Sequence, residues 1–168
     1  MTKAAGAIPL EIGTFTPAEL RTALDSAGVA LNAYAEAFLD HPAVGSSGLQ
    51  HLWLNRHTPE ELGLPAGGSL STIYRAALTA GLRLCPPETA AYLRLVTLDQ
   101  EDAPDSVLSN GTAPSGSLTI ASAPLEIDDE FPKGLYLRVI DGVAWLRGYR
   151  CDDEHVFSPQ DRFVFCSA

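Results

Sequence analysis

Residues 134–150 constrain the fold most, because they are typical of a single β-hairpin closed by the two-residue turn Asp141-Gly142. An Asp-Gly pair suits a type I′ turn, in which both central residues have positive φ. A tight turn fixes the pairing of its two strands, and this pairing decides which face each side chain occupies. One face of the predicted hairpin is entirely aliphatic, with Leu135, Leu137, Val139, Ala144 and Leu146. We therefore expect this face to join a hydrophobic core.

The other face of the predicted hairpin combines aromatic rings with guanidinium groups. Ile140 and Val143 lie beside the turn, and the candidate binding residues follow along the two strands: Tyr136, Arg138, Trp145, Arg147 and Tyr149. The register places Arg138 opposite Trp145 and Tyr136 opposite Arg147. Guanidinium groups attract aromatic faces, and Tyr, Trp and Arg dominate protein interfaces. This face is either a binding surface for a protein or planar ligand, or a layer that only stabilises the sheet.

The first half of the chain predicts several amphipathic helices. Thr16-Pro17-Ala18-Glu19 is a capping box with proline at the first helical position. Ser69 or Ser71 caps a later helix, which Gly81 ends. Apolar spacing and these caps place the longer helices at residues 16–28, 31–39 and 70–78, and shorter ones at 58–61 and 85–92.

The remaining segments predict strands and one long loop within a single domain covering residues 1–168. Residues 1–13 are expected to be a frayed lead-in, and residues 100–117 a flexible loop. Strands are expected at residues 49–54, 93–98, 118–127 with a break at Pro124, and 162–166. The predicted class is α+β, with N-terminal amphipathic helices packed on a mostly antiparallel sheet formed largely by the C-terminal half.

The charge distribution argues against nucleic acid and membranes as partners. Residues 1–100 hold nine acidic and six basic residues, whereas residues 101–168 hold twelve and five, so most of the net charge of −10 lies in the later part. Such a field repels phosphate backbones and anionic lipids. No run approaches 18 apolar residues and no signal-peptide core is present, so we expect no membrane association. Three cysteines without a CxxC motif fit a reducing cytoplasm.

No motif identifies a catalytic, cofactor or metal site, and we predict none. The GxSxG, HExxH, Walker and GxGxxG patterns do not occur. The run Cys151-Asp152-Asp153-Glu154-His155 leaves open a hydrolase-type or metal-dependent enzyme that uses carboxylates and His155. Cys85, which continues an apolar run, is expected to be buried and inert. A third alternative is an acidic inhibitor that imitates nucleic acid through Asp128, Asp129 and Glu130.

One stretch of the chain resembles a family of small uncharacterised bacterial proteins. The likeness lies in Ile73-Tyr74-Arg75-Ala76, Gly81-Leu82-Arg83-Leu84-Cys85-Pro86-Pro87-Glu88, Leu93-Arg94-Leu95 and Asp99-Gln100, and it resumes at Ser158-Pro159-Gln160-Asp161-Arg162-Phe163-Val164-Phe165. The resemblance implies a bacterial, cytosolic, single-domain protein and supplies no catalytic residues. Together with the hairpin, it leads to our main expectation, a non-enzymatic cytoplasmic module that binds another protein.

Overall fold

The computed structural model describes residues 6–45, 47–100 and 116–167, so most of the expected loop near 100–117 lies outside the described residues. The helices in this part are α1 (Pro17–Ser26), α2 (Ala33–Leu39), α3 (Leu70–Thr79) and α4 (Thr89–Val96). The strands are β1 (Ile8–Ile12), β2 (Ala30–Leu31), β3 (Gln50–His57), β4 (Leu82–Arg83), β5 (Leu118–Ile120), β6 (Gly134–Ile140), β7 (Val143–Tyr149) and β8 (Phe163–Ser167).

These strands form one mixed sheet with the order β1-β3-β8-β5-β6-β7-β2, and β4 also pairs with β8. Five pairings are antiparallel, whereas β2 with β7 and β5 with β8 are parallel. The fold is therefore α+β, but the expected order of helices followed by a C-terminal sheet is wrong. Strands β1 to β4 come from the first half of the chain and alternate with its helices. The C-terminal strand β8 joins the two halves because it lies between β3 and β5.

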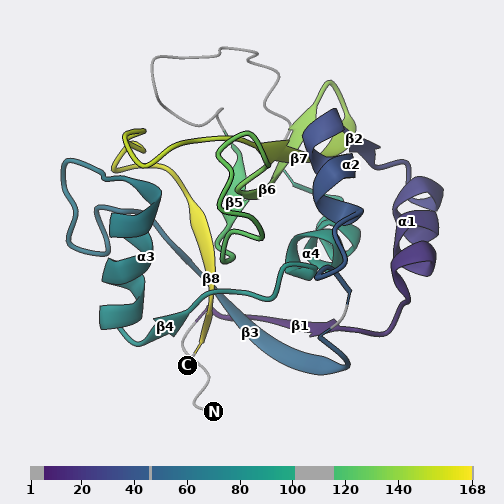
Figure 1. Ribbon diagram of the computed structural model, residues 1–168. Coiled ribbons are helices and arrows are strands. Elements are labelled where there is room, and N and C mark those ends of the chain that lie inside the picture. The colour runs from purple at the N-terminus through teal and green to yellow at the C-terminus, as the bar shows by residue number, and fades with distance from the viewer. Residues whose placement is uncertain (1–5, 46, 101–115, 168) are drawn as a thin grey trace.

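Each face of the sheet carries a hydrophobic core, with α3 on one side and the other helices on the opposite side (Figure 1). Alternate residues of β8 enter different cores: Val164 and Cys166 join the first, and Phe163 and Phe165 join the second, which α3 covers. Helix α4 contacts β1 near one end of the sheet and β6 and β7 near the other. The sheet therefore curls around α4.

The predicted hairpin and helix starts are confirmed. Asp141 and Gly142 have φ values of 50° and 78°, and β6 pairs with β7 in the expected register. The aliphatic face is buried except at the half-buried Ala144 beside the turn, and Leu137 and Leu146 are fully enclosed in the first core. The expected capping box begins α1, and Ser69 caps α3. Local signals were sufficient here because caps and tight turns depend on residues that are close in sequence.

The expectation of a frayed lead-in is wrong for residues 8–12, which form the edge strand β1 paired with β3. Leu10 and Ile12 are buried, whereas Pro9 and Glu11 are exposed, as the period of two in a strand requires. Proline lacks an N–H donor and is confined mainly to edge strands, so Pro9 is tolerated at this position.

The strand expected at residues 93–98 is also wrong, because Leu93–Val96 is the second half of α4. This helix is buried on almost every side, including at Ala90, Leu93 and Arg94, so its sequence has no polar stripe. A short apolar run without such a stripe does not distinguish a helix from a strand. Elsewhere, β5 covers only the start of the strand expected at 118–127, and residues 58–61 form a turn instead of a helix.

Asn32 and Gly148 join α2 to the edge of the sheet. The Asn32 side chain accepts from the Gly148 N–H at 2.8 Å and donates to the Gly148 carbonyl at 3.0 Å, as a paired backbone would. The same Asn32 oxygen caps α2 by accepting from Ala35 N–H. A Cβ placed on Gly148 would lie 2.6 Å from the backbone carbon of Tyr34. The close contact of helix and strand therefore requires glycine at position 148.

Candidate functional site

Three side chains on the outer face of the hairpin form a connected group, which we term the Trp145 row (Tyr136, Trp145 and Arg147). The Arg147 Nε donates to the Tyr136 hydroxyl at 3.0 Å, and the guanidinium carbon lies 4.9 Å from the centre of the Trp145 ring. All three side chains are half-buried. No carboxylate in the described part of the chain forms an ion pair with Arg147. Its terminal amino groups therefore keep donors for an external acceptor.

Of the other two predicted binding residues, Arg138 is buried and Tyr149 is half-buried against the second core. Arg138 is only 5% exposed. The Tyr149 ring packs edge-on against Phe157 in the second core, and burial raises the pKa of its hydroxyl well above the usual range. Strand alternation correctly placed all five residues on one face, but it does not show which part of that face the rest of the chain covers. Arg138 is therefore removed from the surface, and the half-buried Tyr149 has its hydroxyl inside the protein, which leaves the Trp145 row as the candidate surface.

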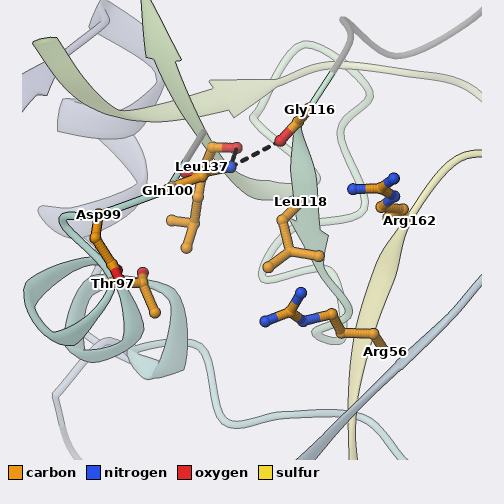
Figure 2. A pocket seen from close by; sticks show the side chains of 8 residues that line it. All are labelled: Arg56, Thr97, Asp99, Gln100, Gly116, Leu118, Leu137 and Arg162. Carbon is orange, nitrogen blue, oxygen red and sulfur yellow. Dashed lines mark hydrogen bonds between the residues drawn. The ribbon is translucent and has the colours of Figure 1, made fainter. Parts of the chain in front are cut away.

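A pocket of about 290 Å³ lies on the opposite face of the sheet, near the end of α4 (Figure 2). Its walls are Arg56, Thr97, Asp99, Gln100, Gly116, Leu118, Leu137 and Arg162. The two arginines approach from β3 and the start of β8, whereas Thr97 and Asp99 lie on the other side of the pocket, after α4 (Figure 2). Leu118 and Leu137, which are paired across β5 and β6, contribute apolar surface.

Strand pairing brings the two arginines of the pocket together. Arg56 lies directly opposite Val164, and Arg162, which immediately precedes β8, is two residues from Val164 along the chain. The two arginines are therefore diagonal neighbours on one face of the sheet. Both are exposed, and neither forms an ion pair with a carboxylate of the described residues. The result is a concentration of positive charge in an acidic protein, at a site that sequence patterns did not reveal.

A buried arginine holds the wall of this pocket in place. Gln100 donates to the carbonyls of Gly116 at 2.7 Å and Leu137 at 3.1 Å, and its oxygen accepts from Arg94 at 2.8 Å. Arg94 is fully buried and also donates to backbone carbonyls of Thr97, Arg138 and Trp145. Gln100 has thus used its polar atoms within the protein, and its role in the pocket is structural.

Several residues that were proposed for an enzyme or for a nucleic-acid mimic form local contacts within the protein. Asp152 accepts from the backbone N–H groups of Glu154 and His155, and the His155 ring packs edge-on against Phe157. Two acidic residues of the proposed nucleic-acid mimic form ion pairs: Asp129 with Lys133 and Glu130 with Arg150. In the part of the chain that the structure describes, no group of three or more His, Cys, Asp or Glu residues is placed to hold a metal ion.

Two of the cysteines are in contact inside the first core. The sulfur atoms of Cys85 and Cys166 lie 3.2 Å apart, and both residues are buried. The hydrogen bond to Cys166, together with burial, raises the pKa of Cys85 well above its usual range. A nucleophilic cysteine requires a lowered pKa and access to solvent. This environment therefore argues against Cys85 as a nucleophile.

Cys151 is half-buried, and this burial raises its pKa to about 11. Because only the thiolate reacts, alkylation of folded protein by iodoacetamide at pH 8 should be about two hundred times slower than that of free cysteine. The rate should increase about tenfold per pH unit up to pH 10. Mass spectrometry of the modified protein measures this rate, and Cys151→Ser should abolish the modification. A rate that becomes constant below pH 9 would contradict the assignment.

Comparisons with known proteins do not identify a family. No protein-family model matches the chain, and neither the curated proteins nor the solved structures give a match. The described helices include none whose length and hydropathy suit a membrane crossing. Any proposal for function therefore rests on the geometry of the Trp145 row and of the arginine-lined pocket.

Proposed function

We propose that this protein is a non-enzymatic module that binds another protein through the Trp145 row. The observation that carries the proposal is the state of Arg147, whose guanidinium is held by Tyr136 and Trp145 without a carboxylate partner among the described residues. An arginine already held in place loses little conformational freedom when it binds. Tyr, Trp and Arg are also the residues that most often carry interface energy.

The chemistry of the row indicates which partner surface it suits. The terminal amino groups of Arg147 match a carboxylate, which accepts two parallel hydrogen bonds from a guanidinium group. Trp145 lies beside this donor, and Val143, 40% exposed on the same face, continues the apolar surface toward the turn. We therefore infer that the partner presents an acidic side chain flanked by apolar ones.

A displayed peptide library tests this proposal while the partner itself is unidentified. Selection on the wild-type protein, with removal of peptides that also bind Trp145→Ala, should enrich sequences in which Asp or Glu is flanked by apolar residues. Affinity for these peptides should fall in Arg147→Gln by at least about 2 kcal/mol, or roughly thirtyfold, because the carboxylate loses its partner. Isothermal titration calorimetry measures the difference.

Leu78→Ala is the matched control, because Leu78 is 53% exposed on α3, away from the row. This variant should bind the selected peptides as the wild type does. Circular dichroism verifies that every variant is folded. Peptides that bind wild type and Arg147→Gln equally, or a selection that enriches nothing dependent on Trp145, would overturn the proposal.

A further inference from the structure

We infer that the pocket between Arg56, Arg162 and Asp99 binds a small organic carboxylate that carries a hydrogen-bond donor or positive charge at its other end. The site lies on the face of the sheet opposite the Trp145 row, because Leu118 and Leu137 belong to the first core. The inference is therefore independent of the proposed protein-binding function.

The arginine side of the pocket specifies an anion. Arg56 and Arg162 are diagonal neighbours on one sheet face, and no ion pair among the described residues neutralises either of them. Two nearby like charges repel each other, and a bound anion removes this repulsion while accepting charge-assisted hydrogen bonds. What distinguishes Arg56 and Arg162 from the other exposed arginines is that both line the same pocket. Because no carboxylate of the described residues pairs with either of them, their donors can serve an external anion at this place.

The rest of the pocket selects the kind of anion. Asp99 stands on the far side, so a ligand with negative charge at both ends is disfavoured, whereas an amino or hydroxyl group there gains a partner (Figure 2). Leu118 and Leu137 lie between the two polar ends and suit a short hydrocarbon segment. A volume of about 290 Å³ accommodates a small molecule.

The probes are the ω-amino carboxylates from glycine to 6-aminohexanoate, with butyrate and inorganic phosphate for comparison. Each is titrated into isotopically labelled protein at constant ionic strength, and NMR shifts of the Gln100 side chain and arginine Nε–H groups are followed. At least one amino carboxylate should bind saturably and at least tenfold more tightly than butyrate. Asp99→Asn should remove that preference, because the amino group then loses its charged partner.

Variants of the arginines separate this site from general charge effects. Affinity should fall at least tenfold in Arg56→Gln/Arg162→Gln. Arg75→Gln/Arg83→Gln, which removes two exposed arginines from α3 and β4, should bind as the wild type does. If phosphate binds more tightly than every amino carboxylate, the ligand class is wrong. If no probe binds saturably, or if both double variants bind equally, the site itself is overturned.

Discussion

The Arg94→Met variant is expected to lose about 3 kcal/mol of unfolding free energy, because four acceptors in or beside the core lose their donor. Arg94 is completely buried and donates to Gln100 and to backbone carbonyls of Thr97, Arg138 and Trp145. It therefore connects the end of α4 to both strands of the hairpin. Methionine preserves much of the volume, so the loss reports the hydrogen bonds more than a cavity. In urea, the unfolding midpoint should fall by about 1–2 M.

Arg75→Met provides the control for this loss, because Arg75 is exposed on α3 and its replacement should change stability by about 0.5 kcal/mol or less. The same experiment tests the architecture of the pocket. With Arg94 gone, the Gln100 oxygen loses its donor, and Gln100 NMR signals should broaden or shift even where the protein is folded. An Arg94→Met protein as stable as Arg75→Met would mean that the buried guanidinium does not organise this region.

Gly148→Ala is expected to destabilise the fold by about 2–3 kcal/mol, because one methyl group forces α2 away from β7. The new Cβ would lie 2.6 Å from the backbone carbon of Tyr34 and 2.8 Å from the nitrogen of Ala35, neither of which can move independently of the helix. Displacement of α2 would also weaken the two hydrogen bonds between Asn32 and the Gly148 backbone. Chemical denaturation monitored by tryptophan fluorescence measures the change.

Gly68→Ala is the matched control for Gly148→Ala. Gly68 has no positive φ, and a Cβ there would meet the Thr72 side chain at 3.4 Å, an ordinary contact distance. Its replacement should therefore change the unfolding free energy by less than about 1 kcal/mol. If both alanine variants are equally stable, α2 and β7 are not held as closely as we describe.

The sequence predicted the Trp145 row but not the burial of its neighbours. The Asp141-Gly142 turn correctly assigned Tyr136, Trp145 and Arg147 to one face, because register follows from a two-residue turn. The same pattern did not reveal that Arg138 is buried or that Tyr149 joins the second core. Whether a side chain on one face of the hairpin is buried depends on segments that are remote in the sequence. The alternation of residues along the hairpin carries no information about those segments.

The pocket could not have been predicted from the sequence. Arg56 and Arg162 are far apart in the chain, and no pattern in the sequence links the two positions. They become neighbours only because β3 pairs with β8 in one particular register. The structural role of Arg94 could not be predicted either, because α4 is enclosed on almost all sides. Such a helix lacks the polar stripe that distinguishes a helix from a strand.

The amino-acid sequence by itself determined the hairpin, its register and the starts of α1 and α3, because turns and caps are set by backbone preferences and hydrogen bonds within a few residues. Only the tertiary structure decided the strand order, the edge position of β1, the helical state of residues 93–96 and the placement of Arg56 beside Arg162 at the pocket. These features depend on burial and on contacts between remote segments. The free energy of such contacts can override local preferences and cannot be read from neighbouring residues.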